Sequence, residues 1–488
     1  MNNKIIFIYD DRFDVPSQIN SLTGAYYFSN ISHRKNKISE YFFNEKVISN
    51  FNHVFHIKSN EDLKSLESFS SEQTNYHYLI IPSYMAPKNI DKLDLLIEKC
   101  KLSLEPVSFV NTYDKRIALL LDQEILINDY LTLPNKTFFA NEFIPHFDNT
   151  VRDLNNTFYD LSDWRSFIDF LWTATGTRSF NSIKLLPDSI KKISKDKTKL
   201  FNEYNFYHLL SSRMKQFIVP TFNYKNNKVD GTSSYEMERI FVPDVSIQYI
   251  NQSFTKDSFS NLTSLFFKYI HSREKKDISK KDASSFFKKT IINKTNLRID
   301  EFLSTSIGVE INKYFLSISL IDIKSLCKRS VKLLNDYDKK YPATYLAQSH
   351  GDPCFSNILF DDKLNIFRLI DPKGASKEDE LYMHPLYDLA KFSHSILGGY
   401  DVLNHELFEC NFDTQLNITL CKNKIKFENE FKTIFQNYCK QNKINLQFVR
   451  VIELSLFISM ISLHIENPKK ILAFLLNAMN LLTELEND

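Results

Sequence analysis

A short stretch near residue 350 constrains this chain more than any other part of the sequence. Asp352 lies five residues before an amide, Asn357, and a second acid, Asp371, follows an apolar run. Phosphoryl transfer from a nucleotide uses such a set of groups. One carboxylate accepts the proton of the attacking hydroxyl, and an amide and a second carboxylate hold the magnesium ion that neutralises the phosphates. The spacing therefore predicts a phosphoryl-transfer site.

The residues between the two acids predict the geometry that such a site needs. Residues 358–360 form an apolar run typical of a short buried strand, residues 361–365 are typical of a turn, and residues 366–370 predict a second strand. A hairpin of these strands would bring Asn357 and Asp371 to one place. Gly351 and Gly374 flank the acids in a chain with only 8 glycines, which indicates special backbone conformations there.

This stretch resembles a motif of aminoglycoside phosphotransferases and choline kinases, which have the protein-kinase-like fold. The motif is H-G-D-x-x-x-x-N, found here from His350 to Asn357, followed by an Ile-Asp pair that ends at Asp371. The resemblance implies that Asp352 is the catalytic base, that Asn357 takes part in catalysis as a magnesium ligand, and that Asp371 is the second ligand of the metal. It also implies ATP and Mg²⁺ as cofactors.

Further along, residues 387–391 read Tyr-Asp-Leu-Ala-Lys and resemble the D-L-A segment of the same families. There the aspartate, Asp388 in this chain, braces the catalytic loop and does not react. Residues 370–374 and 388–395 are also similar to kinase-like proteins of bacterial capsule and surface-polysaccharide biosynthesis. That similarity implies an acceptor, and partners, from such a pathway.

Upstream residues supply candidates for nucleotide binding. Residues 189–194 predict a strand with two lysines, Lys191 and Lys192, on opposite faces, and either one could pair with the phosphates. We favour Lys192, because its sequence context is more similar to the relatives. Residues 199–210 predict a helix, on which Glu203 is the natural partner of that lysine.

Two further segments complete the predicted cofactor site. Residues 176–183 lie where a phosphate-binding loop belongs and include Asn181, although this loop has a single glycine. Residues 234–239 resemble the hinge between the two lobes of a kinase. There the backbone would bind the adenine beside Met237 and Glu238. Strands are expected at 217–222 and 233–237.

The predicted fold class is α+β, a bilobal protein-kinase-like fold preceded by a small α/β domain. Residues 1–150 alternate strands (5–9, 52–57, 78–81 and 107–111) with helices (37–50, 60–68 and 88–101), which predicts a parallel sheet. This domain is interpreted as a binding or assembly domain. Residues 151–243 would form the kinase-like N-lobe with its mixed sheet and a leading helix at 163–172, and residues 244–488 the mainly helical C-lobe. Residues 272–294 are charged and polar, which predicts a loop or part of the acceptor site.

Composition excludes some classes of partner. The 61 basic and 59 acidic residues give a net charge of +2, which gives no electrostatic basis for binding nucleic acid. There is no run of 18 uninterrupted apolar residues, so no membrane span is expected. The 6 cysteines are scattered and none forms a C-x-x-C pair, which is typical of a cytoplasmic protein.

The sequence therefore predicts an ATP-dependent phosphotransferase that acts on a small-molecule acceptor, an alcohol or a sugar. Two alternatives stay open. The single-glycine loop would suit a pseudokinase that binds nucleotide or a partner without catalysis. An aminoglycoside resistance kinase would need an acidic acceptor cleft, for which Glu378, Asp379 and Glu380 are candidates.

Overall fold

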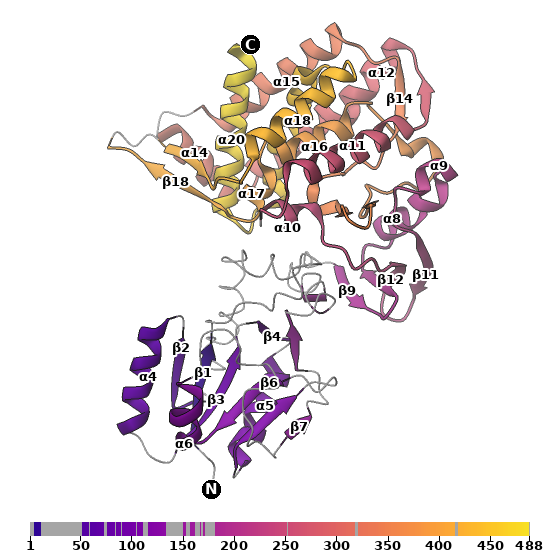
Figure 1. Cartoon of the computed structure of the whole chain (residues 1–488). Helices are drawn as coiled ribbons and strands as arrows, with labels where there is room; N and C mark the ends of the chain where they lie inside the picture. Colours follow the sequence, from indigo (N-terminus) through magenta and orange to yellow (C-terminus); the bar gives the residue numbers. More distant parts are fainter. Residues whose placement is uncertain are drawn as a thin grey trace. The chain divides into compact units, whose positions relative to one another are not determined.

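The chain divides into two compact units, Met1–Gly176 and Thr177–Asp488, which are described separately here (Figure 1). The predicted boundary at residue 150 falls inside the first unit. The predicted helix at 37–50, most of the predicted helix at 163–172 and most of the loop at 176–183 lie outside the described residues, although residues 166 and 169–170 are described and helical. The computed structural model describes residues 4–10, 51–57, 59–72, 76–82, 84–88, 90–103, 105–110, 116–132, 150–152, 157–161, 166, 169–170, 181–250, 252–317, 321–414 and 418–487.

The first unit is built on a six-stranded sheet with the order β2-β1-β3-β6-β5-β7. Strands β2 (His53–Ile57), β1 (Lys4–Asp10) and β3 (Tyr76–Pro82) are parallel, as predicted. Strand β6 (Arg116–Leu121) is antiparallel to both β3 and β5 (Val107–Val110), so the sheet is mixed and the prediction of a parallel sheet holds for only part of it. The remaining elements are β7 (Thr150–Arg152), a β4–β8 pair (Met85–Pro87 and Phe158–Asp160), and the helices α4 (Asn60–Glu72), α5 (Ile90–Leu102) and α6 (Gln123–Ile125) with the π-helical turn η2 (Leu126–Tyr130).

The second unit begins with a four-stranded antiparallel sheet and one helix. Its order is β11-β12-β10-β9, formed by Thr221–Asn227, Thr232–Glu238, Ser189–Ser194 and Asn181–Leu185. The strand predicted at 217–222 therefore begins later, at Thr221. Helix α8 (Lys197–Leu209) follows β10, and the Asp196 carboxylate caps it by accepting the Lys199 N–H. Short helix α9 (Ser212–Lys215) leads into β11.

The rest of the second unit is mainly helical, as predicted for a C-lobe. Helix α19 (Leu446–Met460) lies at its centre and packs on α13, α15, α16 and α20. The stretch Leu446–Leu463 is long and apolar enough to span a membrane, but 67% of it is buried inside the protein, as in a core helix. The other helices are α10 (Val245–Ile250), α11 (Lys256–Ser272), α13 (Asn293–Leu303), α14 (Ser306–Ser317), α15 (Ile323–Lys340), α16 (Tyr387–Ile396), α17 (Tyr400–Asn404), α18 (Glu428–Gln441) and α20 (Pro468–Asn487).

Residues 272–294 form regular structure instead of a loop. They contain β13 (Lys275–Asp277), α12 (Lys280–Phe287) and the π-helical turn η3 (Lys288–Ile292). Strand β13 pairs with β14 (Tyr345–Gln348), and the buried side chains of Ala283 and Phe287 give α12 an apolar face. The apolar residues of this stretch recur at helical spacing, but its many charged residues led us to predict a loop.

The hairpin predicted after residue 357 is confirmed. Strands β15 (Ile358–Asp361) and β16 (Ile366–Leu369) are antiparallel, with Ile358 opposite Leu369. A 3₁₀ turn (Phe355–Asn357) precedes them, and strands β17 (Tyr382–Met383), β18 (Phe408–Phe412) and β19 (Ile418–Lys422) complete the sheets. An antiparallel sheet with one helix, followed by a mainly helical part that carries this hairpin, confirms the bilobal protein-kinase-like class.

Candidate active site

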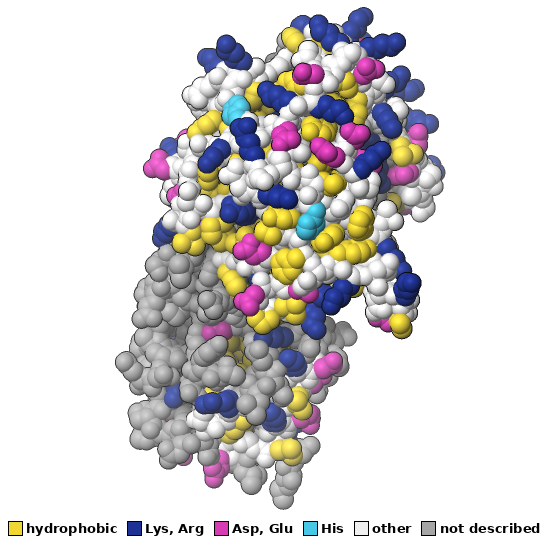
Figure 2. Space-filling view, turned by 90° about the vertical axis from the view of Figure 1, so that its right-hand side faces the viewer, with side chains coloured by type: hydrophobic (Ala, Val, Ile, Leu, Met, Phe, Trp, Pro, Cys, Tyr) yellow, Lys and Arg dark blue, Asp and Glu magenta, His cyan; other side chains and the backbone are white. Residues whose placement is uncertain are grey.

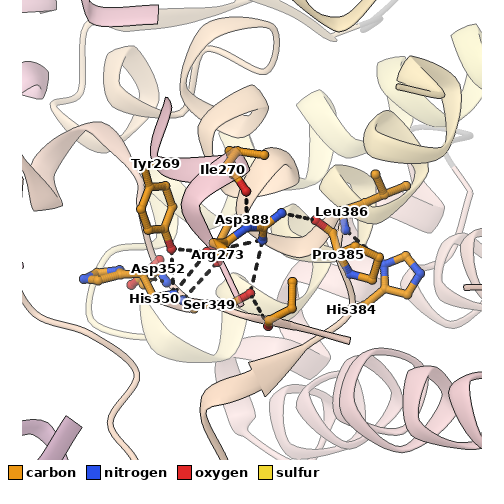
Figure 3. Close-up of polar contacts among 12 residues, drawn as sticks. Tyr269, Ile270, Arg273, Ser349, His350, Asp352, His384, Pro385, Leu386 and Asp388 are labelled. Carbon is orange, nitrogen blue, oxygen red and sulfur yellow. Dashed lines mark hydrogen bonds and ion pairs between the residues drawn. The ribbon is translucent and has the colours of Figure 1, made fainter. Parts of the chain in front are cut away.

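The loop before Asp352 is held by a buried aspartate, Asp388, at the start of α16 (Figure 3). Its two carboxylate oxygens accept the backbone N–H groups of His350 and Gly351, at 3.1 and 3.0 Å. The Tyr269 hydroxyl donates to the same carboxylate at 2.6 Å and accepts the His350 N–H at 2.9 Å. Asp388 is 0% exposed, so these bonds fix the loop in a buried setting where hydrogen bonds are strong.

Arg273, one residue beyond α11, ties this brace to two more segments (Figure 3). Its guanidinium lies 3.8 Å from Asp388 Oδ2 and donates to the Ser349 hydroxyl at 3.2 Å. It also donates to the backbone carbonyls of Ile270 and Pro385, at 3.1 and 2.9 Å. The planar guanidinium of arginine can donate in several directions at once, so one buried cation links the start of the loop at Ser349 to α11 and to the segment before α16.

Asp352 projects from the braced loop and forms an ion pair with Lys391 of α16. Lys391 Nζ lies 2.8 Å from Asp352 Oδ1, and the Asp352 side chain is 40% exposed. Burial is the largest single influence and would raise the pKa of Asp352, but the charge and hydrogen bond of Lys391, together with smaller contributions from other nearby positive charges, outweigh it and lower the pKa below its usual value. The same pair raises the pKa of Lys391 despite its burial. Asp352 is therefore held as a carboxylate, the form in which it could accept a proton.

Asn357 and Asp371 come together through the hairpin. The Ile370 N–H donates to the Asn357 carbonyl at 3.0 Å, so the residues that flank the two strands are adjacent. Asp371 has φ 54°, a left-handed conformation that turns its side chain out of the strand direction. The Asp371 carboxylate is 44% exposed.

The side chains of Asn357 and Asp371 offer oxygen atoms that are suitable ligands for a magnesium ion. The Asn357 amide nitrogen donates to the Asp352 carbonyl at 2.9 Å, which leaves the amide oxygen as its atom for a cation. A carboxylate and an amide oxygen are hard ligands of the kind that Mg²⁺ takes, with phosphate and water oxygens completing its shell. Among the described residues, no group of three or more His, Cys, Asp or Glu could hold a metal without such further ligands.

Lys192 joins the two lobes at this site. Its Nζ lies 2.6 Å from Glu203 Oε2 on α8 and 3.0 Å from Asp371 Oδ1 after β16. Burial disfavours the charge on Lys192, but the neighbouring carboxylates, Asp371 and Glu203, outweigh it and hold its pKa well above the usual value. Burial raises the pKa of Glu203, and Lys192 opposes that shift. Of the two candidate lysines, Lys192 is the one that meets Glu203; Lys191 lies on the other face of β10.

The segment after Asp371 is docked closely on α8. Gly374 has φ 87°, and a Cβ atom there would lie 2.9 Å from the Asn202 backbone, so only glycine fits this approach. The Ala375 N–H donates to the Asn202 carbonyl at 3.0 Å, and the Asn205 amide donates to the Ala375 carbonyl at 3.1 Å. These contacts hold α8, and with it Glu203, against the segment that carries Asp371.

The remaining predicted cofactor residues lie on the N-lobe sheet. Asn181 is the first residue of β9, with its backbone opposite Ser194 of β10. Met237 is buried on β12 opposite Ile190, and Glu238 is the last residue of that strand and is exposed. The Glu238 N–H already donates to the Pro220 carbonyl at 3.1 Å. The structure thus brings Lys192, Glu203, Asp371, Asn357 and Asp352 together around the hairpin, with Met237 and Glu238 at the strand that leads to the C-lobe.

Three residues of this site were not identified from the sequence: Tyr269, Arg273 and Lys391. Lys391 follows Asp388 by three positions, so a helix over 387–396 would place both on one face. That spacing could have identified Lys391 as a residue of the site. Tyr269 and Arg273 lie about eighty residues before the loop they hold, and no local pattern links them to it.

Comparisons with known proteins give structural neighbours at low identity. No family model and no curated protein sequence matches this chain. A complex of aminoglycoside phosphotransferase APH(4)-Ia with AMP-PNP and hygromycin B has a TM-score of 0.39 at 10% identity, over 65% of this chain and 98% of that chain. A glucosamine kinase gives 0.37 at 10% identity, over 64% and 79% of the chains. An ethanolamine kinase from Plasmodium vivax gives 0.37 at 12% identity, over 62% and 81%.

Proposed function

We propose that this protein is an ATP-dependent phosphotransferase that moves the γ-phosphoryl group to a hydroxyl of a small alcohol or sugar. One observation carries the proposal: Lys192 lies between Glu203 and Asp371, 2.6 and 3.0 Å away, although the three come from a strand, a helix and the catalytic hairpin. This is the arrangement in which a kinase lysine is positioned for phosphates and an acid for the metal. The structural neighbours named above are small-molecule kinases with the same general fold.

The residues divide the work as follows. When bound, ATP with Mg²⁺ supplies the transferable phosphoryl group and neutralises its charge. Asn357 and Asp371 would hold the ion, and Lys192, positioned by Glu203, would contact the phosphates. Asn181, Met237 and Glu238 would line the nucleotide site. Asp352, kept as a carboxylate by Lys391, orients the acceptor hydroxyl and takes its proton.

We include a precursor of a capsule or surface polysaccharide among the acceptors, and proteins of that pathway among the partners, on the resemblance of residues 370–374 and 388–395. A cytoplasmic location would suit such a role, since nucleotide and sugar precursors are available there. The first unit, 1–176, is proposed to bind or assemble with other components instead of catalysing a reaction.

The proposal is tested with purified protein, MgATP and a panel of sugars, choline and aminoglycosides, with ADP formation as the measurement. We expect acceptor-dependent ADP formation that Asp352→Asn lowers by about 10²–10⁴-fold. Nucleotide affinity should change little, because the Asp352 side chain pairs with Lys391, and the contact with Asn357 uses the Asp352 backbone carbonyl, which the substitution keeps. ADP formation that is absent with every acceptor, or equal in the variant, would instead support a pseudokinase.

A further inference from the structure

The Lys192–Glu203 pair differs from the charges on the protein surface. Figure 2 shows Lys and Arg side chains dispersed among Asp and Glu over the described part of the visible face. Exposed charges of this kind are solvated, and their pairing contributes little to the structure. The side chains of Lys192 and Glu203 are only 7% and 5% exposed. A buried ion pair depends on the hydrogen bonds that complete it, so each group that contacts Glu203 affects the position of Lys192.

Tyr235 on β12 is such a group. Its hydroxyl donates to Glu203 Oε2 at 3.4 Å, and the same oxygen lies 2.6 Å from Lys192 Nζ. The other oxygen, Oε1, has a more distant neighbour, Lys199 Nζ at 4.0 Å, whose side chain is exposed. Tyr235 is buried, and burial raises the pKa of its hydroxyl, which therefore stays protonated and can donate. Oε2 of Glu203 is thus held by an ammonium group and a phenol together.

The strand register explains why Tyr235 reaches this oxygen. Tyr235 lies directly opposite Lys192 in the antiparallel pairing of β10 and β12. Opposite residues project from the same face of a sheet, and α8, which carries Glu203, packs on both strands. The adjacent pair, Lys191 and Glu236, projects from the other face. The sheet therefore presents the lysine and the phenol side by side to one carboxylate.

We propose that Tyr235 is a positioning residue of the nucleotide site: its hydroxyl fixes the carboxylate of Glu203, which in turn holds Lys192 where the phosphates of ATP bind. The inference rests on the proposed function and assigns a further residue to its nucleotide site. Tyr235 acts through Glu203 and does not itself contact the nucleotide. Without the hydroxyl, the carboxylate is free to rotate, and Lys192 loses the fixed position from which it contacts the phosphates.

The test measures the affinity of the full chain for two probes, AMP-PNP with Mg²⁺ and adenosine. The probes share the base and the sugar, and only AMP-PNP has phosphates for Lys192 to contact. Tyr235→Phe removes the hydroxyl and keeps the ring, whose centroid lies 6.3 Å from that of Tyr204 on α8. We expect this variant to bind AMP-PNP about three- to tenfold more weakly and adenosine with unchanged affinity. Equal weakening of both probes would indicate a general structural role and overturn the inference.

Tyr224→Phe is the matched control. The Tyr224 ring also packs near Tyr204, with centroids 5.2 Å apart, but its hydroxyl donates to the Ser233 hydroxyl at 3.2 Å. This variant should bind both probes like the wild-type protein.

A second background tests the route through Glu203. In Glu203→Ala the acceptor of the Tyr235 hydroxyl is gone, so adding Tyr235→Phe should weaken AMP-PNP binding no further. Unchanged adenosine affinity shows that these variants keep a folded nucleotide site. The inference is overturned if Tyr235→Phe binds AMP-PNP as Tyr224→Phe does, or if its effect is undiminished in Glu203→Ala.

This outcome is separable from the proposed phosphotransferase activity. ADP formation requires an acceptor and turnover, whereas the two affinities require neither. If the protein binds AMP-PNP but forms no ADP with any acceptor, the proposed activity fails and the variants still decide the role of Tyr235. If ADP forms and Tyr235→Phe changes neither affinity, only this inference fails. A wild-type protein that does not bind AMP-PNP with Mg²⁺ would overturn the inference directly.

Discussion

Asp388, at the start of α16, and Asp352, on the loop that Asp388 holds, have opposite surroundings. Asp388 is 0% exposed and is bonded by Tyr269, by two backbone N–H groups and, at longer range, by Arg273. Asp352 is 40% exposed and pairs with Lys391. The first carboxylate has its bonding capacity used within the protein, and the second keeps part of it open to a ligand. Their difference separates the base of the site, which fixes geometry, from its tip, which can react.

The largest effect is expected from Asp388→Asn, which breaks the base of the site. The neutral amide cannot compensate Arg273, and its NH₂ group would face donors, so the free energy of unfolding should fall by about 3–5 kcal/mol. Denaturant unfolding measures this loss. Asp336→Asn, at an exposed position of α15, is the control and should change stability by less than about 0.5 kcal/mol. A loss for Asp388→Asn no larger than the control would show that the brace carries little energy.

The base and the tip differ in how far the sequence could predict them. The residues of the tip could be predicted, because the apolar runs and the turn of the hairpin that joins Asn357 to Asp371 are local sequence patterns. Lys192 and Glu203 could be predicted for the same reason, since a strand and the helix that follows it are short-range sequence patterns. The partners of Asp388 were not, because Tyr269 and Arg273 meet the loop only through tertiary packing.

The same limit explains the errors in the first unit and in the stretch 272–294. Strand β6 is an apolar run whose direction depends on its neighbours in the sheet, so its antiparallel pairing could not be foreseen. Helix α12 is short and highly charged, and it is stabilised by the burial of Ala283 and Phe287. In both places tertiary packing determines the structure, namely the direction of β6 and the helical conformation of α12, which the local sequence pattern does not determine.

Lys391→Met tests the tip, and we expect a smaller effect on stability but a clear change in the pH dependence of turnover. Without the cation, burial raises the pKa of Asp352, so the acid limb of the pH–rate profile should move to higher pH. Asp352 is then protonated, and activity is lost, at a pH where the wild-type protein is still active. Lys391→Arg keeps the charge and should retain the wild-type limb. An acid limb that is the same in Lys391→Met would show that Lys391 does not control Asp352.

Tyr269→Phe sharpens the comparison by removing one bond from the base. The ring can keep its packing against Phe217, while the hydroxyl that links Asp388 to the His350 N–H is lost. The His350 N–H keeps its bond to Asp388, so stability should fall by only about 1–2 kcal/mol. Thermal unfolding measures the change. A loss as large as that of Asp388→Asn would mean that the hydroxyl, and not the carboxylate, is the main brace.

A pH-dependent effect is expected from His384, which lies beside the segment that Arg273 holds (Figure 3). Burial, with a smaller contribution from Arg273, lowers the pKa of His384 to about 3. The neutral form is therefore required in the folded state, and its stabilising effect is present above pH 6.5 and lost as the pH falls towards the folded value. Between these limits the loss approaches about 1.4 kcal/mol per pH unit from this group.

His384→Asn isolates that contribution, because the asparagine oxygen can replace Nδ1 as acceptor of the Leu386 N–H, a bond of 3.3 Å in the wild-type protein. The variant should be less stable than wild type at pH 7, since its side chain fills less of the space between Phe287 and Phe448. The difference should shrink as the pH is lowered from 7 to 5, since the variant has no proton to take up at this position. A stability difference that stays constant over this range would mean that His384 is not kept neutral by the packing around the base of the site.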